Sequence, residues 1–469
     1  MSLLRNSAAL FSSHMLGRAI RFLYLVVLAR LLGPEDTGVY LYGIALYLSS
    51  MKLAHFGQSI FLSERIGKHG SVPLSVLRNS FVLVFGSTLL VSLLLALFVG
   101  ITEQDELMLA MLSFVGALAA RALATWVRFA YTALQSVSWV PRYEVIFRGL
   151  EATTGVFLLW TGGGGLAAVC ALHFLVWAIE AGFALRRLAR DHPGVLRFDS
   201  RLIYLRRMIA VSVEFLIFMT ATSLLAQLSV LLLKHVQDDA AFVGQFGIAM
   251  QFLTTLLMLP AAVGAAFLPR LSRAYRSGNG GRDLVIGAKL LAAIAVAVSI
   301  LAAAYGPYFI EVVLGKVYDS TGTAFASLSW IFLPYALVTF VGQSLNVIGK
   351  RRAAAAIMGC VVLTHGILML LFMDGGAESA TIRSLFIACL LGTIASLIVV
   401  DRQIGLIDRA WPFKISAAAL LAYFIINSDW LPPMIEPLLA LLIVGAALLA
   451  LKVFNREDVR AVKRVLGIA

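Results

Sequence analysis

Long apolar runs divided by short polar breaks occupy most of this chain and limit what it can fold into. About fourteen runs, each near the 20 residues that a helix needs to cross a bilayer, succeed one another from residue 8 to residue 454. Hydrophobic residues make up 61% and charged residues 13% of the 469 residues, against about 45–50% and about 25% in soluble chains. Mean hydropathy is +0.92. The sequence therefore predicts an all-α integral membrane protein of about 14 transmembrane helices. It excludes a disordered chain, a secreted disulfide scaffold, a porin-type barrel and a nucleic-acid binder.

The 38 Lys and Arg residues are distributed unevenly between the breaks. Most of them fall in every second break, and cytoplasmic loops carry such an excess of positive charge. This pattern places both termini in the cytoplasm, which an even number of spans satisfies. The basic segments are Arg5, 63–79, 128–148, 186–207, 269–283, 349–352, 401–414 and the tail from Lys452.

An internal repeat relates the two halves of the chain. The residues that follow the first and the seventh span share four identities: Val39, Gly43, Ile44 and Ala45 match Val243, Gly247, Ile248 and Ala249. Both segments join spans of the same orientation, so the repeat is parallel, with its axis along the membrane normal. We predict two six-helix lobes, 1–206 and 207–412, around a central cavity. Helices 13 and 14 (413–454) and an amphipathic cytoplasmic tail (455–469) follow them.

Three stretches carry a resemblance to a known family. They are 29–40 (ARLLGPEDTGVY), 56–65 (FGQSIFLSER) and 259–275 (LPAAVGAAFLPRLSRAY). They resemble the Wzx-like polysaccharide transporter branch (oligosaccharide flippases) of the multidrug/oligosaccharidyl-lipid/polysaccharide exporter superfamily. The resemblance implies a V-shaped cavity between two lobes, alternating access and a place in the bacterial inner membrane. It also implies an undecaprenyl-diphosphate-linked glycan as substrate, with polysaccharide polymerase and ligase machinery as partners beside the membrane lipid.

Four cations lie deep inside the expected early spans, where an isolated charge costs about 2.5–3.5 kcal/mol on insertion scales. They are Arg18, Arg21, Lys52 and Arg121. Arginine binds phosphate oxygens through paired hydrogen bonds, so we predict that the four hold the diphosphate of the substrate. Lipid II flippases, which the chain resembles, also use basic residues at the inner end of span eight, where Arg270 stands here.

Three carboxylates lie in the inner halves of spans five, six and seven: Glu151, Glu180 and Glu214. They are expected either to couple transport to Na⁺ or H⁺ or to form salt bridges that lock helices to one another, with the four cations as partners. The sequence predicts no metal site and no other cofactor. Structural roles are expected for His55, His173 and His365, and a lipid-facing surface position for Lys289. Pro260 and Pro334 predict kinks in spans eight and ten.

Three functions remain open at this point. The first is a flippase for a lipid-linked oligosaccharide in polysaccharide or O-antigen assembly, and a lipid II flippase is its near alternative. The second is a multidrug/cation antiporter of the same superfamily, which needs acidic residues in its cavity. None of the 13 Asp residues lies deep in a span, which disfavours it. The third is a membrane glycosyltransferase, but the outer acids Glu103, Asp105 and Glu106 share one short turn without a His. No enzymatic activity is therefore predicted.

Overall fold

The structure is a computed structural model. It describes residues 3–69, 72–134, 139–162, 164–197, 202–237, 239–276, 280–405, 408–428, 432, 435–455 and 458–460. Within these ranges it gives no side-chain environment for 3–14, 64, 67–69, 105–106, 141, 202, 269–270, 272–274, 276 and 280. All regular secondary structure in the described residues is helical, as the apolar runs predict. Most of the tail 455–469 lies outside them.

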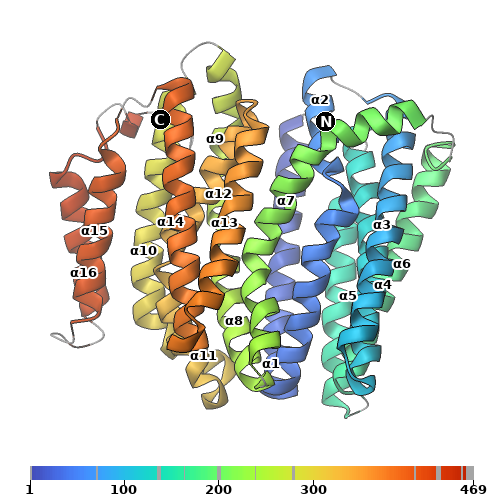
Figure 1. Ribbon diagram of the computed structural model, residues 1–469, viewed down its shortest axis with the longest axis horizontal. Coiled ribbons are helices and arrows are strands. Elements are labelled where there is room, and N and C mark those ends of the chain that lie inside the picture. Colours follow the sequence, from blue (N-terminus) through green and yellow to red (C-terminus); the bar gives the residue numbers. More distant parts are fainter. Residues whose placement is uncertain are drawn as a thin grey trace. The chain divides into compact units, whose positions relative to one another are not determined.

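The chain divides into two compact units, 1–244 and 245–469. The first contains α1 (Leu3–His55), α2 (Gln58–His69), α3 (Leu74–Thr102), α4 (Asp105–Ala133), α5 (Val140–Trp160), α6 (Leu166–Asp191) and α7 (Leu202–Val236). Within it α4 and α6 lie side by side, and α1 packs against α5 and α7 (Figure 1). Helix α7 thus belongs to the first compact unit, whereas the predicted first lobe ends at residue 206. The six-helix division stays a prediction.

The second unit begins inside α8 (Ala240–Leu256). It continues with α9 (Met258–Arg276), α10 (Gly280–Leu314), the short η1 (Lys316–Tyr318), α11 (Asp319–Ser329), α12 (Phe332–Val347), α13 (Arg351–Leu371), η2 (Met373–Gly375), α14 (Ala377–Ile404), α15 (Trp411–Ile426) and α16 (Glu436–Ala450). Helices α15 and α16 pack on each other and on α10 at one side of this unit (Figure 1).

Eight helices of the described chain are long and apolar enough to cross a membrane, or nine if the bent pair α11–α12 counts as one span. They are Leu74–Thr102, Leu107–Ala133, Leu166–Asp191, Ile203–Val236, Ala240–Leu268, Gly281–Leu314, Arg351–Leu371 and Ala377–Ile404. The shorter apolar helices α15 and α16 follow. The protein is therefore a multi-pass membrane protein, and the arrangement of 14 spans in two lobes stays a prediction.

Helix α1 covers the first two expected spans and is interrupted at Gly33, whose φ of 81° and ψ of 173° are not helical. A positive φ is accessible to glycine at little cost, and the following Pro34 cannot donate the helical hydrogen bond. Arg18 and Lys52, on either side of this break, are close enough for their charges to repel each other. The break therefore turns the chain back, as expected for two consecutive spans.

Two glycines let the chain just after this turn pack backbone to backbone on the start of α8. A Cβ atom added at Gly38 would lie 2.2 Å from the Ala240 carbonyl oxygen and 2.9 Å from the Gly244 nitrogen. A Cβ atom at Gly244 would lie 2.0 Å from the Pro34 carbonyl oxygen. Because the obstructing atoms are backbone, they cannot rotate away. This contact joins the two segments that the internal repeat relates.

Replacing Gly38 by alanine is therefore expected to destabilise the protein by about 2 kcal/mol through overpacking. Gly86→Ala in α3 is the matched control, since a Cβ atom there meets nothing within 4 Å. That change should be neutral or stabilising by up to about 1 kcal/mol because alanine favours the helix. Thermal unfolding in detergent measures both; equal effects would show that the contact is not tight.

Two of the second unit's breaks occur where proline removes a hydrogen bond. Helix α8 ends at Leu256, four residues before Pro260, and the α11–α12 bend of 55° lies at Trp330, four residues before Pro334. Since proline lacks the N–H that bonds the carbonyl four residues earlier, a break is expected there. The predicted kink at Pro334 is confirmed, and the helix is interrupted before Pro260 as well.

Lys289 corrects the expectation of a lipid-facing surface lysine. Its side chain is 2% exposed, and its Nζ atom lies 2.8 Å from Asp408 Oδ2 and 3.1 Å from Asp458 Oδ2. Asp408 precedes α15 and Asp458 follows α16, so one cation of α10 bonds both ends of the terminal helix pair. The sequence separation hid the partners: a buried lysine needs a carboxylate, and the two that Lys289 contacts lie more than 100 residues further along the chain.

Lys289→Met should destabilise the protein by about 3 kcal/mol, because it leaves the buried Asp458 carboxylate without its cation. Burial acts to raise the pKa of Asp408, but the hydrogen bond and charge of Lys289 outweigh it and hold that pKa below its ordinary value. The contribution of Asp408 is therefore complete above its unfolded pKa of about 3.9 and is lost as the pH falls through the lowered folded value. Unfolding at several pH values tests this. Arg409→Gln is the control. It removes an ion-pair partner of Asp401, but the Arg409 side chain is 76% exposed, so the loss of stability should be under about 1 kcal/mol.

Candidate functional site

The charged residues of the first unit gather where α4, α5 and α6 meet. Helix α5 carries Glu144, Arg148 and Glu151 at spacings of four and three residues, which places them on one face of a helix. Because α4 packs along α6, Arg128 of α4 comes close to Glu180 of α6. Three separate helices thus supply one cluster.

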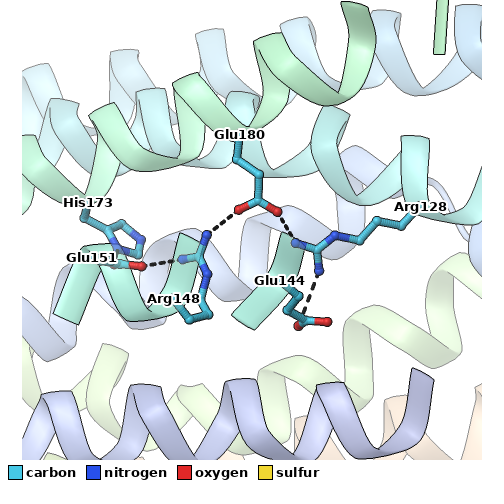
Figure 2. A network of polar contacts seen from close by, with 6 residues as sticks. All are labelled: Arg128, Glu144, Arg148, Glu151, His173 and Glu180. Carbon is cyan, nitrogen blue, oxygen red and sulfur yellow. Dashed lines mark hydrogen bonds and ion pairs between the residues drawn. The ribbon is translucent and has the colours of Figure 1, made fainter. Parts of the chain in front are cut away.

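Figure 2 shows the resulting network, which we call the charge network: Arg128, Glu144, Arg148, Glu151, His173 and Glu180. Arg148 donates to both Glu151 and Glu180, and the second oxygen of Glu180 accepts from Arg128. Arg128 Nη1 lies 3.3 Å from Glu144 Oε1. The Glu151–His173 contact, from Oε1 to Nδ1, is 2.5 Å.

Every member of the charge network is buried or nearly so; the side chains of Arg148 and Glu151 are 1% and 3% exposed. Buried ions are stable only when they are paired and hydrogen-bonded, and removing one partner strands the other. Glu180 is the central member, since in the described chain it bonds both Arg128 and Arg148. The network therefore fixes the relative positions of α4, α5 and α6.

Aromatic rings extend this site toward Arg121. The buried Trp177 ring of α6 lies 3.8 Å from the Arg148 guanidinium carbon and 4.8 Å from that of Arg121. Arg121 also lies 5.1 Å from the centre of the Tyr47 ring. A guanidinium between two ring faces is attracted by both while the N–H groups at its edge remain able to donate to an anion.

The predicted diphosphate-binding cations fall in this same unit. Arg18 is exposed, whereas Arg21, Lys52 and Arg121 are half-buried. Arg21 is electrostatically coupled to Arg148 and Glu151, and Arg18 to Glu144. Among the described residues, however, no carboxylate lies within ion-pair distance (4.0 Å) of any of the four. The side chain of Arg270, at the inner end of α9, lies outside the described residues.

The three predicted carboxylates have different environments. Glu151 and Glu180 form salt bridges, with Arg148 and Arg128 as their partners rather than the four predicted cations. Glu214 is half-buried in α7 and makes contacts of its own. In the part of the chain that the structure describes, no three His, Cys, Asp or Glu side chains are placed to hold a metal ion.

Sequence reasoning missed Arg128, Glu144 and Arg148. It counted 128–148 as a basic cytoplasmic loop, but α4 continues to Ala133 and α5 begins at Val140. The spacing of Glu144, Arg148 and Glu151 on one helical face was the available signal. The second part of that signal was Glu180, a carboxylate of α6, the helix that packs along α4.

The family is now evident. The family model described as "Polysaccharide biosynthesis protein" matches residues 3–275, and the chain belongs to that family. This family is consistent with the Wzx-like branch that the sequence motifs resemble. The fold is shared with a solved transporter of the MOP superfamily. No curated protein matches the chain.

Solved structures share this fold at low identity. A structure of lipid II flippase MurJ in an inward closed conformation is 14% identical, covering 95% of this chain and 98% of that chain with a TM-score of 0.71. An inward-facing MATE family multidrug transporter is 12% identical, covering 82% of this chain and 95% of that chain with a TM-score of 0.68. The MATE multidrug transporter DinF-BH is 15% identical, covering 87% of this chain and 98% of that chain with a TM-score of 0.64. At such identities the likeness establishes the fold.

Proposed function

We propose that this protein is a flippase that moves an undecaprenyl-diphosphate-linked oligosaccharide from the inner to the outer leaflet of the bacterial inner membrane. The glycan would serve polysaccharide or O-antigen assembly. The observation that carries the proposal is the set of four cations in the expected early spans, Arg18, Arg21, Lys52 and Arg121, which have no carboxylate within ion-pair distance among the described residues. Membership of the polysaccharide biosynthesis family supports it.

The charge of the first unit favours an anionic substrate. The four predicted cations and the two arginines of the charge network, Arg128 and Arg148, make six positive side chains, against the four carboxylates Glu144, Glu151, Glu180 and Glu214. The carboxylates of the charge network are already bonded to Arg128 and Arg148. An excess of two positive charges remains, and a diphosphate diester carries two negative charges. The proposal therefore assigns the diphosphate to Arg18, Arg21, Lys52 and Arg121, with Arg270 as a further contact.

Transport would proceed by alternating access between two six-helix lobes, with α15 and α16 as the terminal pair. Both termini would lie in the cytoplasm, as the distribution of positive charge indicates. The sugars would occupy the cavity between the lobes while the polyprenyl tail stays in the bilayer. Energy would come from coupling to H⁺ or Na⁺, and a polymerase and a ligase would consume the product outside. No catalytic step is assigned to the chain.

Two alternatives use the same fold. A lipid II flippase would use the same cations, because its substrate also carries a diphosphate. A multidrug antiporter would need carboxylates to receive a cationic drug, but Glu151 and Glu180 are bonded to arginines. The site therefore favours a lipid-linked diphosphate over a cationic drug.

A reconstituted assay tests the proposal. Purified protein in liposomes should move a fluorescent polyprenyl-diphosphate oligosaccharide between leaflets, measured as the fraction that a membrane-impermeant quencher reaches. Protein-free liposomes and liposomes with a cationic dye in place of the glycolipid are the controls. Movement of the dye but not of the glycolipid would contradict the proposal and favour the antiporter.

A further inference from the structure

The sequence predicts only a structural role for His173, but the environment of its ring in the structure is unusual. It is 5% exposed on α6, and its Nδ1 atom faces Glu151 Oε1 at 2.5 Å. Its second ring nitrogen, Nε2, is buried and has no hydrogen-bond partner among the described residues. A carboxylate therefore orients the ring while the opposite nitrogen is unused.

Two further unpaired polar groups belong to aromatic side chains that pack against His173. Tyr47 lies with its ring centre 5.4 Å from that of His173, and Trp177 with its ring centre at 6.5 Å. The Tyr47 hydroxyl and the Trp177 Nε1 atom are likewise buried without a partner in the described chain. Arg121 stacks on both rings and has no carboxylate within ion-pair distance among the described residues. Three buried unpaired groups thus adjoin an arginine that can bind an anion.

Burial and the neighbouring charges together decide when His173 can take up a proton. Burial opposes the charged imidazolium, Glu151 favours it, and Arg148 of α5 and Arg121 of α4 oppose it. Arg21 of α1 acts on Glu151. Tyr47 of α1 and Glu180 of α6, which is bonded to Arg148, are further titratable groups at this place. Tyr24 and Tyr40 of α1 face Glu151, and Cys170 of α6 lies near both tyrosines. With Glu151 at Nδ1, the neutral ring holds its proton on Nδ1, and a second proton must go to Nε2. A buried N–H without an acceptor is costly, so this proton needs an anion.

We propose that the Glu151–His173 pair takes up a proton when an anionic phosphate group binds at Arg121, so that anion binding and proton binding favour each other. The inference rests on the proposed function and identifies the proton as the ion whose binding is coupled to anion binding at this site. In the step, a proton from water binds Nε2, the ring becomes an imidazolium held by Glu151, and the phosphate oxygen accepts from Nε2. The net charge that the bound diphosphate brings to the site falls by one unit.

Because anion binding and proton binding are thermodynamically linked in this proposal, it can be tested by binding measurements without a transport assay. If one proton enters with each anion, affinity rises as the pH falls, by at most about tenfold per pH unit, across the range of about pH 8 to 5 in which histidine titrates. The probe is a symmetric dialkyl diphosphate, because its two negative charges are constant over that range. Binding to the purified full-length protein in detergent would be measured by calorimetry at several pH values. Proton uptake would be read with an indicator dye in weak buffer.

Three variants separate this role from a structural one. His173→Gln should bind the probe with an affinity that no longer changes with pH, and should show no proton uptake with the dye. Glu151→Gln keeps a hydrogen-bonding partner at Nδ1 but removes the negative charge, so the pH dependence should move to lower pH. His365→Gln is the matched control: His365 is a buried histidine of the second unit with Nδ1 3.0 Å from Ser384 Oγ, and its replacement should leave the wild-type pH dependence.

The outcomes are distinct. A wild-type affinity that is independent of pH, or a His173→Gln protein that keeps the wild-type pH dependence, would overturn the inference and leave the flippase proposal in place. Failure of the wild type to bind the probe at any pH, together with failure to move the glycolipid in liposomes, would overturn both. If His173→Gln does not fold, the shift expected for Glu151→Gln and the wild-type proton uptake still decide the matter.

Discussion

Arg121→Gln should slow glycolipid movement by about ten- to a hundredfold while leaving the protein folded. A hydrogen bond to a charged group is worth about 1.5–3 kcal/mol, and each 1.4 kcal/mol is about tenfold. Arg121 is half-buried between the Tyr47 and Trp177 rings, and the described residues offer it no carboxylate. Its loss would therefore remove the proposed contact with the substrate and break no ion pair of the described chain. The measurement is the initial rate in liposomes, with thermal unfolding in parallel.

A matched control exists on α6. Arg187 also stacks on a tryptophan, with its guanidinium carbon 4.6 Å from the Trp139 ring, but its side chain is 36% exposed and pairs with Asp191. Arg187→Gln should leave the transport rate unchanged. Arg121→Lys keeps the charge but loses the planar set of donors, so an intermediate rate is expected. Equal rates for wild type and Arg121→Gln would contradict the assignment of Arg121 to the substrate.

Glu180→Gln should destabilise the first unit by about 3 kcal/mol or more, which is a large fraction of the stability of a typical protein. The reason is that Glu180 bonds both Arg128 and Arg148, and the buried Arg148 would keep only Glu151. Unfolding in detergent measures the loss. Asp374→Asn, which removes an exposed carboxylate of η2, should change stability by less than about 0.5 kcal/mol.

A double-mutant cycle shows whether the effect arises in the charge network. Arg148→Met removes the stranded cation, so Glu180→Gln should cost less in that background, with a coupling of about 1–3 kcal/mol. Additive effects would mean that the two side chains do not stabilise each other. The transport rate of the double variant would then report on Arg121 and its ring partners alone.

The fold class could be read from the sequence because it depends on composition and on the length of apolar runs. Both breaks before proline residues were also predictable, since proline breaks a helix through its own missing N–H. The chain reversal at Gly33 followed from the polar Gly-Pro-Glu-Asp segment between two apolar runs. These features are local, so neighbouring residues determine them.

The ion pairs were not predictable, because they join residues far apart in the chain. Lys289 bonds carboxylates from beyond α14 and α16, and Arg128 bonds one from α6. The expectation that Glu151 and Glu180 pair with the early-span cations failed to name the arginines that they contact, since those were counted as loop residues. The half-buried position of Arg121 and the buried His173 Nε2 atom, which has no hydrogen-bond partner among the described residues, depend on tertiary packing alone.

The most direct test of the central claim is the sidedness of polyprenyl-diphosphate oligosaccharide in cells that lack this protein. We predict that the glycolipid accumulates in the inner leaflet, that wild-type protein clears it, and that a variant carrying both Arg18→Ala and Lys52→Ala does not. Full clearance by that variant would contradict the cation site. If no glycolipid accumulates on the inner side, the flippase account is wrong for this chain.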